Sequence, residues 1–209
     1  MIVVVGTPAW REAEPAGPDG RACLIALAAA RRGAAVELVG RAGEDAAGDA
    51  LMIALARGGV GHVALLRDPA RPTPIVAPAP EEGTLVDEHA EEPAPRSIVG
   101  PILEPADVSL ALRYLPSYGV IVVTDEVMPT IVPVAAEAAA FAGAHLVVLV
   151  QEGGAPDGAT EGTVLEAPAV DPDGAFAELV GSYAAALDAG VRPADAFGAA
   201  TGAWERPGA

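Results

Sequence analysis

Five short runs of apolar, largely β-branched residues recur along the chain, and they constrain its fold more than any other feature. Strands that are apolar at every position, rather than at alternate positions, are typical of parallel sheets covered on both faces. Longer Ala- and Leu-rich stretches with helical propensity separate them. This alternation predicts an α/β fold with a doubly wound, mostly parallel sheet and right-handed crossovers. The predicted strands are 2–5, 36–39, 63–66, 120–124 and 146–150.

The helical stretches complete this prediction. A length of 209 residues suits one domain, 1–209, with a substantial core. The last predicted helix opens with a proline, which is favoured in a first helical turn. The predicted helices are 20–32, 45–57, 105–115, 129–142, 174–189 and 193–203.

Residues 72–95 interrupt the alternation, because they are rich in proline and acidic residues. Two interpretations stay open. One is a small β-hairpin lid, with strands at 73–79 and 84–90 around the turn Glu81-Glu82-Gly83. The other is an acidic, Pro-rich loop.

Composition excludes several classes of function. The net charge of −17 opposes binding to nucleic acids and to anionic membranes. All twelve basic residues are Arg, and the absence of Lys excludes a Walker A loop and Schiff-base chemistry. The three histidines are scattered without ligand spacing, so no metal site is predicted.

Several features also point to a location. No uninterrupted apolar run approaches the ~18 residues needed to span a bilayer. The N-terminal Met-Ile-Val-Val-Val-Gly is interpreted as a buried strand rather than a signal peptide. The single cysteine, Cys23, excludes an internal disulfide and lies in a helix as a small apolar side chain. We therefore expect a cytoplasmic protein.

The segment Asp171-Pro-Asp-Gly-Ala-Phe-Ala-Glu-Leu-Val-Gly carries the strongest functional signal. It resembles the Asp-Thr-Thr-Gly-Ala-Gly-Asp-x-Phe-x-Gly signature of the ribokinase / phosphofructokinase-B family of sugar and nucleoside kinases. In that family the Gly-rich turn opens a helix whose N–H groups bind the moving phosphate, and the Asp takes the proton from the acceptor hydroxyl. The resemblance implies a remnant of this anion hole at Gly174, Ala175 and Phe176. It also places Ala177 at the position of the catalytic base, where alanine cannot act.

Three further blocks occur in the order found in the family. They are Gly40-Arg-Ala-Gly-Glu-Asp-Ala-Ala-Gly-Asp with Arg71-Pro-Thr, then Asp125-Glu-Val-Met-Pro, and then Glu152-Gly-Gly-Ala. The first resembles the entry to the lid, the second a substrate loop and the third the loop over the nucleotide. The resemblance therefore extends from residue 1 to about residue 203. It also indicates a shortened member, because only one helix and one strand lie between Glu126 and Gly153.

Other positions depart from the family pattern. Arg11 stands where the family has a sugar-binding Asp, and Leu24 stands where the Gly-Gly-x-x-x-Asn-x-Ala motif has its Asn. The chain contains no Asn at all, so the Asn-x-x-Glu motif that positions magnesium is missing. The resemblance implies substrate-cleft positions at Arg11, Gly20, Leu24, Asp125 and Glu126, and nucleotide-loop positions at Gln151, Glu152 and Gly154.

Three classes of function stay open. The first is a pseudokinase, a kinase-like fold without phosphotransfer that binds a small molecule or a protein partner. The second is a carbohydrate kinase with a rebuilt site, using Asp173, Glu178 or the Asp125–Glu126 pair as base. The third is a structural or oligomerising subunit. No cofactor is predicted for the first and third classes; ATP and magnesium are required only for the second. The lid resemblance implies a homodimer formed through residues 72–95.

Overall fold

The core of the protein is a parallel β-sheet, seen in a computed structural model that describes residues 1–76, 100–151, 153–154 and 162–204. The strand order is β10-β9-β8-β1-β4-β5, and β6 extends the same edge by pairing with the second half of β4. Every pairing in this sheet is parallel. The strands are β1 Ile2–Val5, β4 Val36–Gly43, β5 Val60–Gly61, β6 Leu65–Asp68, β8 Val120–Val123, β9 His145–Gln151 and β10 Thr163–Ala167.

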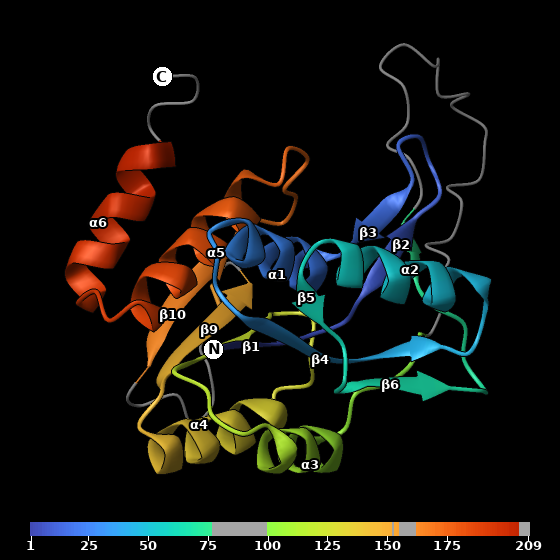
Figure 1. The fold of residues 1–209 in the computed structure, drawn as a ribbon, viewed down its shortest axis with the longest axis horizontal. Helices are drawn as coiled ribbons and strands as arrows, with labels where there is room; N and C mark the ends of the chain where they lie inside the picture. Colours follow the sequence, from blue (N-terminus) through green and yellow to red (C-terminus); the bar gives the residue numbers. More distant parts are fainter. Residues whose placement is uncertain (77–99, 152, 155–161, 205–209) are drawn as a thin grey trace.

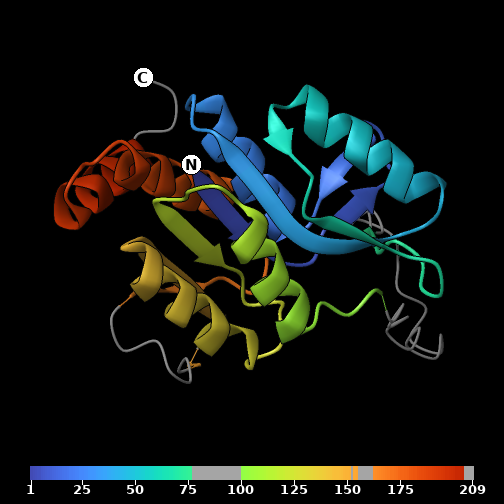
Figure 2. The ribbon, with the colours of Figure 1, turned by 60° about the horizontal axis from the view of Figure 1, so that its bottom comes forward.

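Helices cover both faces of this sheet, which gives the three layers visible in Figures 1 and 2. One layer holds α1, α2, α5 and α6, and the opposite layer holds α3 and α4. The predicted doubly wound α/β class is confirmed. The helices are α1 Arg21–Arg31, α2 Ala46–Arg57, α3 Pro105–Tyr114, α4 Ile131–Ala142, α5 Ala175–Asp188 and α6 Pro193–Trp204.

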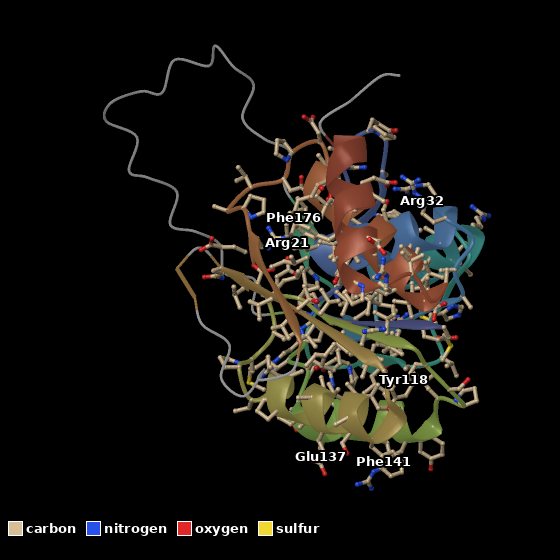
Figure 3. The ribbon with its side chains drawn as sticks, turned by 90° about the vertical axis from the view of Figure 1, so that its left-hand side faces the viewer. Arg21, Arg32, Tyr118, Glu137, Phe141 and Phe176 are labelled. Carbon is tan, nitrogen blue, oxygen red and sulfur yellow. The ribbon has the colours of Figure 1, made fainter. Side chains whose placement is uncertain are left out.

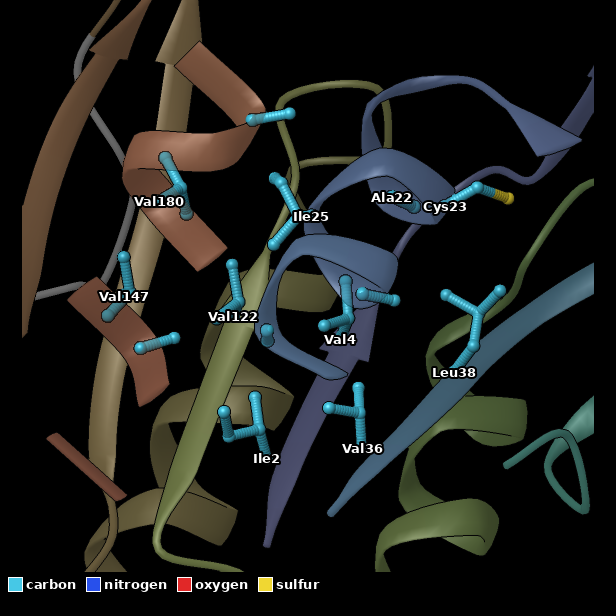
Figure 4. Packing of buried hydrophobic residues seen from close by; sticks show 14 of the residues in the cluster. Ile2, Val4, Ala22, Cys23, Ile25, Val36, Leu38, Val122, Val147 and Val180 are labelled. Carbon is cyan, nitrogen blue, oxygen red and sulfur yellow. The ribbon is translucent and has the colours of Figure 1, made fainter. Parts of the chain in front are cut away.

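Strand β1 shows why a continuous apolar run indicates a strand that is covered on both faces. Its side chains alternate between the two faces, so Ile2 and Val4 pack under α1 and α5, while Val3 and Val5 pack against α3 and α4. All four are fully buried. Figure 4 shows the first of these cores, in which Val4, Val122 and Val147 point toward Ile25 of α1 and Val180 of α5.

Helices α1 and α5 approach one another closely at a glycine. A Cβ atom at Gly181 would lie 2.6 Å from the Cβ of Ala28 and 2.8 Å from the backbone N of Ala29. Only a residue without a side chain fits between the two helices at this point. The crossing therefore sets where the N-terminus of α5 lies relative to α1.

A second, three-stranded sheet follows the order β3-β2-β7, with β2 at Ala9–Arg11, β3 at Gly17–Asp19 and β7 at Ile75–Val76. Strands β2 and β3 are antiparallel, whereas β2 and β7 are parallel. The start of the first predicted lid strand thus pairs with an unpredicted hairpin. The turn Glu81-Glu82-Gly83 and the second predicted lid strand lie outside the described residues.

Hydrogen bonds anchor the chain at Thr73, near the start of the Pro-rich segment 72–95. The Asp45 side chain caps α2 by accepting from the Gly48 N–H at 2.8 Å. It also accepts from the N–H and the hydroxyl of Thr73, at 2.8 and 2.7 Å. The same hydroxyl accepts from the Gly43 N–H at 2.9 Å, and Thr73 is 1% exposed. Two segments of the family-like first block are therefore joined by one carboxylate.

All six predicted helices are present, with ends within two residues of the prediction. The strand predicted at 63–66 is shifted, because a turn from His62 to Leu65 delays its start and leaves Val63 79% exposed. Strands β2, β3, β5 and β10 were not predicted, because they are short or carry polar residues. Among the described helices, none is long and apolar enough to cross a bilayer.

Candidate functional site

The residues singled out by sequence gather at the carboxyl ends of the parallel strands, where open α/β sheets bind ligands. Asp125 and Glu126 follow β8, Gln151 ends β9, and Asp171 follows β10. The N-termini of α1 and α5 face the same edge, since both helices run back along the sheet. The site is therefore the region between these loops and the two helix starts.

The first turn of α5 begins as expected, at a glycine. Gly174 has φ of 67°, the left-handed conformation that glycine adopts without strain, and the helix starts at Ala175. However, the helix donors already have an acceptor. The two carboxylate oxygens of Asp171 accept from the N–H groups of Phe176 and Ala177, each at 3.0 Å. A carboxylate of the chain itself therefore occupies two N–H groups at the start of this helix.

The side chains at the two altered signature positions are turned inward. Ala177 is 1% exposed and Phe176 is 5% exposed, and both join the core between the sheet and α1. The Phe176 ring contributes to the core, while the backbone N–H of Phe176 donates to Asp171.

Neither proposed substitute base in this turn is placed like the missing Asp. Asp173 is exposed beside the turn. Glu178 pairs with Arg31 at 2.5 Å and with Arg32 at 3.1 Å, at the far end of α1. Partial burial raises the pKa of Glu178, but the two guanidinium groups outweigh it and hold this pKa below its ordinary value. A carboxylate so stabilised in its ionised form is a poor proton acceptor.

Arg21, which sequence reasoning did not single out, connects the separate parts of the site. Its guanidinium pairs with Asp125, 104 positions away, and donates to the carbonyl of Pro168 at 2.7 Å. It also lies 5.8 Å from the centre of the Phe176 ring, at cation–π distance. Figure 3 labels both side chains. The Arg21 and Asp125 side chains are only 11% and 6% exposed. The pair therefore holds α1, the loop after β8 and the loop after β10 together.

Glu126 differs from its neighbour. Burial, and then the negative charge of Asp125, raise the pKa of Glu126, and they outweigh a hydrogen bond from the backbone of Arg21. This shift moves the pKa of Glu126 toward the range suited to a general base.

The predicted substrate positions on β2 and α1 lie close together. Arg11 of β2 pairs with Asp19 of β3 at 3.2 Å and also donates to the carbonyl of Pro15. Gly20 has φ of 80° and immediately precedes α1. Its backbone N–H donates to the Asp19 carboxylate at 2.7 Å. Leu24, at the position of the family's Asn, packs against the core. An ion pair and an apolar side chain thus occupy positions where the family binds sugar hydroxyls.

Two of the predicted nucleotide-loop residues meet the end of β8. Gln151 and Gly154 line a small cavity of about 150 Å³ together with Asp125 and Thr124. The Thr124 hydroxyl is buried and has no hydrogen-bond partner among the described residues. Glu152 lies outside them. The cavity is large enough for a few water molecules but too small for a nucleotide base and sugar.

A larger pocket, of about 540 Å³, lies between the loop after β10, the start of α5 and α6. Apolar side chains make up most of its lining, with Asp171 and Glu166 as its carboxylates. Phe197, 40% exposed, packs edge-on against Tyr183 at its border. Its size is in the range that holds a small organic molecule. Among the residues that the structure describes, no Arg or Lys lines it, so no described side chain within it balances the charge of a polyphosphate.

The residues present do not fit the magnesium nucleotide that the resemblance implies. Within the described part of the chain, no three acidic, histidine or cysteine side chains come together as metal ligands. Two of the α5 donors suited to a phosphate, the N–H groups of Phe176 and Ala177, are bonded to Asp171. No step involving magnesium ATP can therefore be derived from this site.

Comparison with known proteins agrees with the fold. No protein-family model and no curated protein sequence matches this chain. Among solved structures it is similar to ribokinase from Arabidopsis thaliana complexed with ribose and ATP, with a TM-score of 0.65 and 15% identity over 97% of this chain and 90% of that one.

Two other solved structures show the same likeness. Phosphofructokinase-2 from Escherichia coli in complex with fructose-6-phosphate gives a TM-score of 0.62 at 14% identity, covering 98% of this chain and 92% of that one. Aminoimidazole riboside kinase from Salmonella enterica gives 0.64 at 14%, covering 95% and 88%. The ribokinase-like fold implied by the sequence motifs is confirmed.

Proposed function

We propose that this ribokinase-like chain does not transfer phosphate and instead binds a small molecule in the cleft at the carboxyl edge of its sheet. The observation that carries the proposal is the contact of Asp171 with the N–H groups of Phe176 and Ala177. A helix N-terminus attracts anions through unpaired donors and its dipole. Here a carboxylate of the chain itself already binds both donors.

The position of Ala177 supports the same conclusion. Phosphoryl transfer to a hydroxyl needs a group that accepts the proton, and losing a positioned base typically lowers the rate by ~10²–10⁴. Ala177 has no titratable group and its side chain lies in the core. The pocket of about 540 Å³ beside this turn is the space in which we expect the small molecule to bind.

Turnover is the first test. We expect no ATP-dependent phosphorylation of ribose, fructose 6-phosphate or adenosine by the purified protein with magnesium, measured as ADP release. An authentic ribokinase in the same assay serves as the positive control. A turnover number in the ordinary range of ~1–10³ s⁻¹ on any of these substrates would contradict the proposal.

Anion binding separates the role of Asp171 from that of net charge. We expect titration calorimetry to detect no binding of ATP, ADP or phosphate to the wild-type protein, and weak but measurable binding to Asp171→Ala, which exposes two helix donors. Asp173→Ala is the matched control, because it removes the same charge from the same turn without exposing a donor. Equal gains in both variants, or micromolar ATP binding by the wild type, would show that Asp171 does not block the site.

A kinase with a rebuilt base is the second candidate, and one observation favours it. The raised pKa of Glu126, caused by burial and by Asp125, suits a general base. If turnover is found, Glu126→Gln should abolish it and Glu178→Gln should not, because Glu178 is paired with Arg31 and Arg32. Turnover that survives Glu126→Gln excludes Glu126 as the base.

A further inference from the structure

Helix α4 lies on the outside of the molecule but is apolar on nearly all sides. Its sequence, Ile-Val-Pro-Val-Ala-Ala-Glu-Ala-Ala-Ala-Phe-Ala, contains a single charged residue, Glu137. Its inner side covers the sheet through Ile131, Ala135 and Ala139. A helix that packs on one side only normally carries polar residues on the other. The composition of α4 is that of a helix covered on both sides.

The outer side of α4 and the adjoining end of α3 expose large apolar side chains. Phe141 is 94% exposed, Tyr114 81% and Leu110 53%. Figure 3 shows Glu137 and Phe141 pointing away from the sheet. An aromatic side chain that is almost fully exposed on an apolar helix is typical of an interaction surface.

The same surface is hollowed. A groove of about 760 Å³ runs between α3, α4 and the loop that follows α3, with Leu112, Leu115, Val134 and Ala138 in its lining. Phe141 stands at its edge and also contributes to the lining. One face therefore offers both a protruding aromatic ring and an apolar groove. We call the groove lining together with Tyr114 the α3/α4 face.

The charges of the α3/α4 face are also complementary to one another. Arg113 and Glu137 both line the groove, one positive and one negative. In the described part of the chain neither forms an ion pair. The net charge of −17 therefore arises elsewhere on the molecule. A strongly basic partner would find little negative charge to bind here. A second copy of the same surface, in contrast, offers a Glu to Arg113 and an Arg to Glu137.

We propose that the α3/α4 face is a two-fold interface with a second copy of this chain. In an isologous contact the same patch serves both subunits, so it must be complementary to itself. The protruding Phe141 and the groove satisfy this in shape. Arg113 facing Glu137 of the partner subunit satisfies it in charge, twice per dimer. This interface differs from the homodimer through residues 72–95 that the family resemblance implies.

Sedimentation velocity on the full chain tests the interface. We expect the wild type at tens of micromolar to sediment as a dimer, with about twice the chain mass of 20.8 kDa. Phe141→Glu should sediment as a monomer with an unchanged melting temperature, since this side chain is 94% exposed in the single chain. Val170→Glu is the matched control and should remain dimeric. Val170 is 77% exposed and lies in the loop that follows β10.

A charge exchange tests the two-fold geometry itself. Arg113→Glu alone and Glu137→Arg alone should each weaken the dimer at least ~10-fold, because each places like charges opposite one another twice. An equimolar mixture of the two variants should recover the dimer, because every contact then joins Arg to Glu. If each substitution weakened the dimer only by disturbing the fold of its own chain, mixing the two variants would not restore the dimer.

The remaining outcomes decide against the proposal. A wild-type protein that is monomeric at these concentrations overturns it. A dimer that resists both Phe141→Glu and the charge variants overturns it as well. Dissociation only when residues 77–90 are deleted, with Thr73 and β7 retained, would assign the dimer to the Pro-rich segment instead.

Discussion

Asp171 and Ala177 lie on either side of the first turn of α5, and each changes the chemistry that this turn can support. The carboxylate of Asp171 accepts hydrogen bonds from the turn, which provides the capping that helix starts require. Ala177 directs its side chain into the core. The turn is thus capped as a structural element, and the Asp171 contacts that cap it use two N–H groups that could otherwise bind an external anion.

At the residue scale we predict that restoring the family residues will not restore a kinase. Ala177→Asp places a carboxylate at a site that is 1% exposed, so it should destabilise the fold by about 1–3 kcal/mol. Adding Phe176→Gly removes a buried ring and should cost about 3–5 kcal/mol more. Urea unfolding measures both effects, and the ADP-release assay should stay negative.

Ala175→Asp is the control for this prediction, because position 175 is exposed in the same turn and a negative charge is favourable at a helix start. We expect it to be neutral or slightly stabilising. Robust turnover in the double variant would instead indicate that the rest of the catalytic site is intact.

At the element scale, the Asp45 carboxylate joins the start of α2 to the strand that leads into the lid segment. It accepts from Gly48 within the helix and from Thr73, which lies 28 positions away in sequence. The glycines around it are required for close packing, since a Cβ at Gly48 would lie 2.3 Å from the Gly43 carbonyl oxygen. The Gly-x-x-Gly-x-Asp-x-x-Gly pattern is therefore explained by packing and capping.

We predict that Asp45→Ala will lower the free energy of unfolding by about 2–3 kcal/mol, because it removes a helix cap and leaves the buried Thr73 hydroxyl without its acceptor. Asp49→Ala, in the first turn of the same helix, is the control. Its side chain is 71% exposed and pairs only with Arg67, so the loss should stay below about 1 kcal/mol. Equal losses in the two variants would show that the contacts of Asp45 are not important.

The same residue should make stability depend on pH. Burial raises the pKa of Asp45, but the hydrogen bonds from Gly48 and Thr73 outweigh it and hold this pKa below its ordinary 3.8. Because the folded-state pKa is the lower one, ionised Asp45 stabilises the fold above pH 3.8, and this contribution is lost as pH falls through the folded-state pKa. The difference in stability between the wild type and Asp45→Ala should therefore narrow in acid.

At the scale of the whole molecule, excess negative charge opposes the compact state. The chain carries 29 acidic residues against 12 basic ones. Many of the arginines are used in local pairs, such as Arg41 with Asp107 at 2.9 Å and Arg192 with Asp195 at 2.7 Å. The unpaired acidic residues repel one another across the surface, and this repulsion is screened over ~8 Å at physiological salt.

We predict that the melting temperature will rise as sodium chloride increases from about 10 to 200 mM, since screening relieves this repulsion more than it weakens the few ion pairs. Each kcal/mol of relieved repulsion should raise the melting temperature by about 2–4 °C in a chain of this size. The Phe141→Glu variant serves as the comparison, because it excludes salt-dependent dimerisation as the cause. A melting temperature that falls with salt would mean that ion pairs dominate.

The sequence alone determined the six helices, the long apolar strands and the fold class, because those depend on local chemistry. Wholly apolar runs such as Ile2–Val5 need cover on both faces, and Gly174 is suited to the left-handed start of α5. The resemblance around Asp171 also implied that alanine, Ala177, stands at the position of the family's catalytic base. Only the tertiary structure decided which residues the charged side chains around this signature contact.

Arg21 meets Asp125 and Pro168 across 104 and 147 positions, and Glu178 meets Arg31 across 147. These contacts depend on how α1 crosses α5 at Gly181 and on the order of the strands, which no local pattern encodes. The α3/α4 face also became visible only in the folded molecule. The sequence of α4 is typical of a buried helix, and only the packing shows which side of it stays uncovered.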